Sequence, residues 1–139
     1  MANNRAKIYE ILHGKYKYSE YNVKFVCFYC GMPADTVDHV PSLNEAYCIG
    51  LDRIEEEGIR LNLVHACREC NGLLGARESL CPFERRDMAQ ELLRKRYKRV
   101  LNMPDWSDEE LEEIGRSMQE EIKKSVDLKR LIQRRVSFG

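Results

Sequence analysis

Apolar and polar residues recur with different periods along the chain, and each period predicts a different element. The apolar positions of residues 3–13 have the spacing of a short helix. Residues 16–28 alternate aromatic with polar side chains and are expected to be extended. Strands are predicted over residues 36–40 and 59–64, with Pro41 ending the first of them. The N-terminal half is therefore expected to mix short helices and strands.

Capping signals set the limits of the helices that follow. Ser42 with Glu45 three residues later is a capping box, which predicts a helix over residues 43–49 that ends at Gly50. Residues 51–57 are expected to add one or two further helical turns.

The C-terminal half is predicted to be helical throughout. Pro82 suits the first turn of a long helix that stops before Pro104. Ser107 begins a final helix with a second capping box. The apolar stripe of this last helix shifts in phase near residues 125–127, which predicts a kink or a break there.

Composition indicates a globular chain whose charges are segregated. Of 139 residues, 43% are hydrophobic and 33% charged, and no apolar run suggests a leader peptide or a membrane span. The net charge is zero, yet residues 85–99 carry seven basic against two acidic side chains, and residues 105–121 carry eight acidic against one basic. Such segments are either solvated helix faces that pair with each other or a basic face for phosphates.

The six cysteines change this picture most. Four of them form two C-x-x-C pairs, Cys27/Cys30 and Cys67/Cys70, and in the intracellular context expected here this spacing indicates metal rather than disulfides. A two-residue spacer lets both thiolates of a pair face one Zn²⁺, which prefers four ligands in a tetrahedron. The sequence therefore predicts one structural zinc. The remaining two cysteines are expected to be buried as small apolar residues: Cys48 and Cys81.

A second set of polar residues lies between and just after these pairs. Asp38 and His39 belong to the first predicted strand, and Asn71 directly follows Cys70. With the zinc bound, the Asp38 carboxylate and the Asn71 carbonyl are expected to converge beside the His39 imidazole. Oxygen ligands suit Mg²⁺ or Mn²⁺, and an imidazole with a pKa of about 6.5 can act as a neutral base. These groups are the apparatus for hydrolysing a phosphodiester.

The order and spacing of these motifs resemble the zinc-bound branch of the HNH endonuclease family. The resemblance covers about residues 25–80, a little under half the chain. Its motifs are Cys27-Phe-Tyr-Cys30, then Thr36-Val-Asp-His-Val-Pro41, then Asn62 to Asn71, and Gly75.

The resemblance implies a role for each residue of the motif. His39 would be the general base, and Asp38 would bind the catalytic cation, Mg²⁺ or Mn²⁺, with Asn71 as its second ligand. Asn62 would fix the loop so that the imidazole points at the scissile phosphate.

The chain departs from the family pattern at one position and in one segment. Many members carry Lys or Arg three residues after the last motif residue, where this chain has Leu74. The segment between His39 and Asn62 is acidic, which would repel DNA if it faced the cleft. The residues expected to contact nucleic acid are Arg68, Arg77, Arg85 and Arg86.

We therefore predict an α+β chain with a small ββα-metal core at residues 25–81, held by zinc. Residues 1–24 are expected to pack on this core, and residues 82–139 to form a helical extension. The expected function is metal-dependent cleavage of DNA, and the alternative is a non-cleaving zinc scaffold that binds DNA or a protein partner. A cytoplasmic location, in a bacterium or a phage-infected cell, is expected. The oligomeric state is expected to be a monomer or a homodimer through the C-terminal helices.

Overall fold

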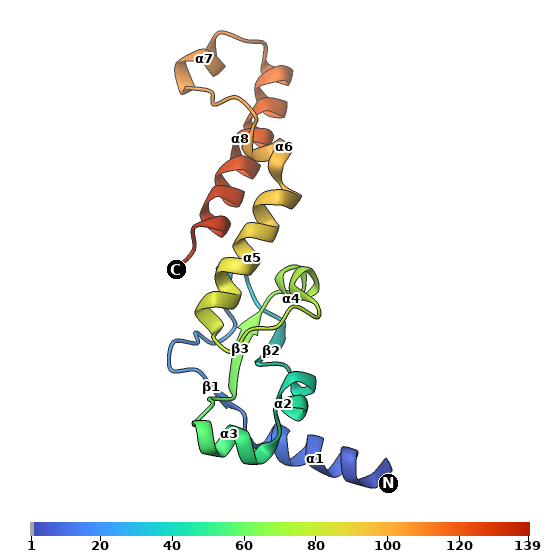
Figure 1. Ribbon diagram of the computed structural model, residues 1–139. Helices are drawn as coiled ribbons and strands as arrows, with labels where there is room; N and C mark the ends of the chain where they lie inside the picture. Colours follow the sequence, from blue (N-terminus) through green and yellow to red (C-terminus); the bar gives the residue numbers. More distant parts are fainter. Residues whose placement is uncertain (1) are drawn as a thin grey trace.

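The computed structural model describes residues 2–139 and shows a mixed α+β chain with one small sheet, which confirms the predicted fold class at that level (Figure 1). The elements, in chain order, are α1 (Ala2–Lys15), β1 (Lys17–Tyr18), β2 (Thr36–Val40), α2 (Leu43–Ile49), α3 (Leu51–Glu57), β3 (Asn62–Ala66), α4 (Arg68–Leu74), α5 (Pro82–Arg96), α6 (Lys98–Leu101), α7 (Asp108–Glu112) and α8 (Arg116–Val136).

The sheet is built around the antiparallel pair of β2 and β3. Its strand order is β1-β3-β2, and β1 runs parallel to β3. The register of β2 and β3 runs from Thr36 opposite Ala66 to Val40 opposite Asn62. Helix α4 begins directly after β3 and packs against β2, so these three elements form a ββα unit.

The predicted helices over residues 43–49 and 51–57 are confirmed, whereas the second strand was placed wrongly. It spans Asn62–Ala66 instead of residues 59–64. The N–H of Ile59 donates to the carbonyl of Ile54 at 3.0 Å and so closes the preceding helix. The alternation of apolar and polar residues cannot show where the strand begins, because its pairing with β2 decides that.

Apolar side chains form two separate buried clusters. One lies between the sheet and the C-terminal helices, and the other lies under α1, α2 and α3. The first includes Tyr29, Val64, Leu74, Leu93 and Ile132, and the second includes Leu12, Tyr16, Ala46, Ile54 and Leu61.

Helices α5 and α8 lie side by side and project away from the sheet, with α7 at the far end (Figure 1). The break expected near residues 125–127 is absent, because α8 runs unbroken from Arg116 to Val136. The interruption falls at Gly115, which has an extended backbone and precedes the first turn of α8. The side chain of Gln119 donates to the carbonyls of Leu111 and Ile114, which satisfies the end of α7.

Two further expectations concern exposure. Cys48 and Cys81 are exposed, contrary to the prediction that they are buried; Cys48 lies in α2, and Cys81 is the residue directly before α5. Across residues 2–139, every helix is too short or too polar to span a bilayer.

Candidate metal centre and catalytic residues

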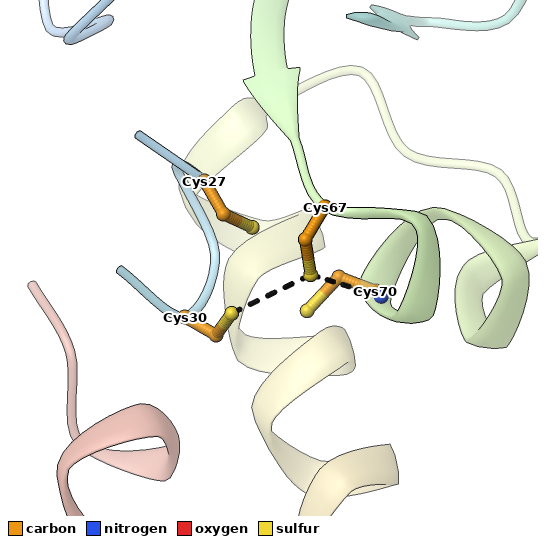
Figure 2. Close-up of side chains that lie close together, drawn as sticks. All are labelled: Cys27, Cys30, Cys67 and Cys70. Carbon is orange, nitrogen blue, oxygen red and sulfur yellow. Dashed lines mark hydrogen bonds between the residues drawn. The ribbon is translucent and has the colours of Figure 1, made fainter. Parts of the chain in front are cut away.

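Four cysteine side chains from three segments converge at one point beside the sheet. Cys27 and Cys30 come from the loop before β2, Cys67 follows β3, and Cys70 lies in the first turn of α4 (Figure 2). Their sulfur atoms all lie within 4.8 Å of one another, and the Cys30 and Cys67 sulfurs are 3.6 Å apart. All four side chains are buried.

Local backbone geometry holds each pair of cysteines. The N–H of Cys27 donates to the carbonyl of Met32 at 2.7 Å, and Gly31 closes this turn with a φ of 78°. A side chain at Gly31 would meet the ring of Phe138, so glycine is required on two counts. Cys67 caps α4, because its sulfur accepts from the N–H of Cys70 at 3.4 Å.

This cluster fits a zinc ion. Thiolates about 2.3 Å from a tetrahedral Zn²⁺ lie about 3.8 Å from each other, which agrees with the sulfur separations here. All four ligand positions would be filled, so such a zinc stabilises the fold and leaves no position open for a water or substrate.

An arginine from the far end of the chain reaches the same cluster. Arg135 of α8 is buried, and its Nη2 lies 3.4 Å from the Cys30 sulfur and 3.9 Å from the Cys67 sulfur. Its Nη1 forms an ion pair with Glu69 of α4 at 2.6 Å. Tyr97 donates to the same carboxylate. A guanidinium here offsets the negative charge that four thiolates place around a divalent ion.

Asp38, the expected cation ligand, is engaged by other side chains. Its Oδ2 accepts from Nε of Arg85 at 2.6 Å and from the hydroxyl of Tyr29, and its Oδ1 accepts from Nη2 of Arg85 at 3.4 Å. Both partners of the ion pair are buried. As placed, Asp38 therefore does not fit an open Mg²⁺ or Mn²⁺ site, since both its oxygens are occupied.

His39 points to the opposite side of β2 from Asp38. Its ring lies 4.9 Å from that of Tyr16 and 5.3 Å from that of His13, measured between centroids. The Nε2 atom is buried and has no hydrogen-bond partner. Burial, assisted by the charge of His13, lowers the pKa of His39, while Asp38 acts in the opposite direction. The imidazole is therefore neutral over a wider range of pH than a free histidine.

The two asparagines lie on the Asp38 side of the sheet. Asn71 donates from Nδ2 to Oγ1 of Thr36 at 3.3 Å, and Thr36 shares a face of β2 with Asp38. Asn62 begins β3 opposite Val40 and is half-buried. The structure thus gathers the four cysteines, and it brings Asn71 to the side of Asp38 but leaves His39 on the other face.

The four arginines expected to contact nucleic acid differ in environment. Arg85 is buried against Asp38 and also donates to the carbonyl of Arg77, so its expected contact with a phosphate stays a prediction that requires it to leave these partners. Arg86 is half-buried against the rings of Phe28 and Phe83. Exposed positions are held by the remaining two, Arg68, which pairs with Asp35, and Arg77.

Sequence reasoning missed one cluster of acids beside the site. The Ser42 hydroxyl that caps α2 also donates to Glu78, at 2.9 Å from Oε1. Hydrogen bonding to Glu78, together with burial, raises the pKa of Glu45 to about 7. Glu45 and Glu78 lie 33 residues apart in the sequence, so no local pattern could have indicated that these two side chains influence each other.

Comparisons with models of protein families, with curated proteins and with solved structures found no match to this chain. The four-cysteine cluster fits a zinc-binding domain, and that is the class of protein that the fold and the site define.

Proposed function

We propose that this zinc-binding domain belongs to a nuclease of the HNH type that cleaves DNA with His39 as general base. The proposal is supported by the order of motifs in the sequence and by the ββα unit of β2, β3 and α4 beside the cysteine cluster. Asp38 and His39 lie in β2, and Asn71 follows the last cysteine.

The state of His39 is the observation that carries the proposal. A buried ring nitrogen without a hydrogen bond costs about 1–3 kcal/mol of stability. Native proteins retain such groups where they serve a purpose other than stability. With its lowered pKa, the neutral ring has a nitrogen that can accept a proton, and because Nε2 is buried, water and substrate reach it only if the side chains over it move.

The chemistry asked of His39 is simple. The neutral imidazole accepts a proton from water, and the hydroxide attacks the phosphorus of the scissile diester. The bond from phosphorus to the leaving oxygen breaks, and this oxygen takes a proton from solvent. The base accelerates such a step by about 10²–10⁴-fold.

The cation is the most demanding part of the proposal. Binding of Mg²⁺ or Mn²⁺ by Asp38 and Asn71 requires Asp38 to release Arg85. If it does so, the guanidinium becomes available to a phosphate, as the sequence suggested.

The second candidate is a zinc scaffold that binds DNA or a protein without cutting. The buried pair of Asp38 and Arg85 favours it, because removing one charge from its partner in a buried site is costly. Under this alternative Asp38 stabilises the fold and has no part in chemistry.

Cleavage of supercoiled plasmid by zinc-loaded protein separates the two candidates. Reactions contain Mg²⁺, Mn²⁺ or no added divalent ion, and they compare the wild type with His39→Ala and with Cys48→Ala as a matched control on an exposed site. We expect cation-dependent cleavage that His39→Ala lowers at least about hundredfold while its zinc content stays unchanged. Cleavage that persists in His39→Ala would refute the assigned base, and retention of intact plasmid by all three proteins would favour the scaffold.

A further inference from the structure

The face of the sheet that carries His39 is covered along only part of its length. The register places His39 opposite Leu63 and Val37 opposite His65, so all four lie on one face. The end with His39 and Leu63 packs against the cluster under α1. At the other end, Val37 is 36% exposed.

Aromatic rings gather over this open end. Tyr18 stacks on His65 with the ring centroids 5.1 Å apart and the planes 15° from parallel. The ring of Phe25 lies 5.7 Å from the same imidazole. Tyr18 is 51% exposed and Phe25 63%. We call Tyr18, Phe25, Val37 and His65 the aromatic face; exposed aromatic rings gathered on one imidazole are suited to binding a ligand.

The aromatic face includes a residue with an unfavourable backbone conformation, although its ring is exposed and adds little to the core. Phe25 has a φ of 64°, which is rare and unfavourable for a bulky side chain. Its carbonyl accepts from the N–H of Ala34 at 2.8 Å, which fixes this conformation while the ring itself stays in solvent. Asn22 accepts from the N–H of His65 at 2.7 Å and also contacts its Nδ1. Ordering exposed rings in advance lowers the entropy lost when a ligand stacks on them.

The charges around the aromatic face favour an anion. The ammonium of Lys24 lies 5.0 Å from the centroid of the Phe25 ring. An open groove of about 1170 Å³ continues alongside β1, where Lys17, Arg60, Tyr18 and Tyr21 line it.

Most acids of this groove are already neutralised. Glu55 pairs with Lys15 and Glu57 with Arg53, which leaves Glu20. Three cations near the aromatic face form no ion pair within residues 2–139: Lys17, Lys24 and Arg60.

We propose that the aromatic face binds unpaired bases of a single-stranded nucleic acid, an inference that rests on the proposed function in taking nucleic acid as the partner. Bases stack on Tyr18 and Phe25, and the phosphates lie along Lys24 and the groove. Bases in a duplex are already stacked on each other and cannot offer their faces, whereas aromatic rings flanked by cations suit a single strand.

Fluorescence anisotropy of a labelled oligothymidylate and of a duplex of equal length tests this, using zinc-loaded full-length protein without added Mg²⁺ or Mn²⁺. We expect the single strand to bind more tightly, and Tyr18→Ala and Phe25→Ala each to weaken it at least about fivefold. Tyr18→Leu keeps apolar area without an aromatic ring and should bind as weakly as Tyr18→Ala. The matched control is Tyr9→Ala, since Tyr9 stacks on Tyr47 under Arg5, remote from this face.

Several results would overturn the proposal. These are a tighter complex with duplex, an equal loss in Tyr9→Ala, or full affinity in Tyr18→Leu, which would indicate an apolar surface for a protein. Zinc content measured in each variant shows that the fold is kept. Binding is measured without cutting, so ring-dependent binding by a protein that leaves plasmid intact would refute only the nuclease proposal. Cleavage lost in His39→Ala but unchanged in Tyr18→Ala and Phe25→Ala, with wild-type binding of the oligothymidylate, would refute only the aromatic face.

Discussion

Asp38 and Arg85 form the least exposed ion pair of residues 2–139, with side chains 9% and 5% accessible. They lie 47 residues apart in the chain, and Tyr29 completes the group. A buried charge that loses its partner costs about 3–5 kcal/mol, whereas a surface pair contributes at most about 1 kcal/mol.

Arg85→Met should therefore lower the free energy of unfolding by about 3–5 kcal/mol, because Asp38 is left buried and unpaired. The matched control is Arg53→Met, which breaks the exposed pair with Glu57 and should leave the free energy of unfolding nearly unchanged. Denaturant unfolding measures both. The double variant Asp38→Asn/Arg85→Met should cost less than the sum of its single changes. Equal, small effects of Arg85→Met and Arg53→Met would mean that the buried pair does not form.

At this scale the sequence predicts what local rules decide. The spacing of the cysteine pairs and the caps at Ser42 and Ser107 follow from neighbours in the chain, and the structure has all of them. The partners of Asp38 and of the Cys30 sulfur cannot be predicted from neighbours in the chain, because Arg85 and Arg135 approach them only through tertiary packing. Pattern reasoning therefore listed Arg85 among the contacts to nucleic acid and did not find its pairing with Asp38.

Among the elements, α8 is joined to the metal centre through Arg135. This side chain contacts two cysteine sulfurs and Glu69, and thereby ties α8 to α4 and to the loop before β2. Groups that contact metal ligands in this way commonly affect metal affinity by 10–100-fold.

Arg135→Met should weaken zinc binding about tenfold or more, since the thiolates lose a buried cation and Glu69 loses its partner. Competition with a chromophoric chelator measures the affinity. Arg134→Met serves as the control, because Arg134 is the adjacent exposed residue of the same helix. Equal zinc affinities of the two variants would contradict a role for Arg135 at the metal centre.

Element boundaries follow the same division between local and tertiary causes. The helix at residues 43–49 was predicted correctly, because its serine cap and terminal glycine are adjacent in sequence. The bounds of the strand Asn62–Ala66 were not predicted correctly, because they depend on pairing with β2. The position of the helix break was not either, since it falls at Gly115, before α8, and α8 itself is unbroken. Apolar phase alone carries neither piece of information.

The whole molecule consists of two modest apolar clusters joined through a short sheet. Six buried residues of the larger cluster, counting the four cysteines with Phe28 and Tyr29, come from the cysteine segments themselves. The helices α5 and α8 bury Leu93, Ile132 and Val136 within the chain, so the apolar stripe that suggested a dimer is used largely for internal packing. A homodimer through the outer positions of these helices stays a proposal.

Zinc stoichiometry and thermal unfolding, measured on one preparation, test the central claim that the four cysteines bind a structural zinc ion. We expect one zinc per chain, and a large fall in Tm when a chelator removes it or when Cys70→Ser removes one ligand, because a structural zinc contributes folding energy directly. Cys48→Ser, which changes an exposed cysteine outside the cluster, should keep both the zinc and the Tm. A zinc-free protein with a cooperative transition, and a Tm that Cys70→Ser leaves unchanged, would contradict the metal centre.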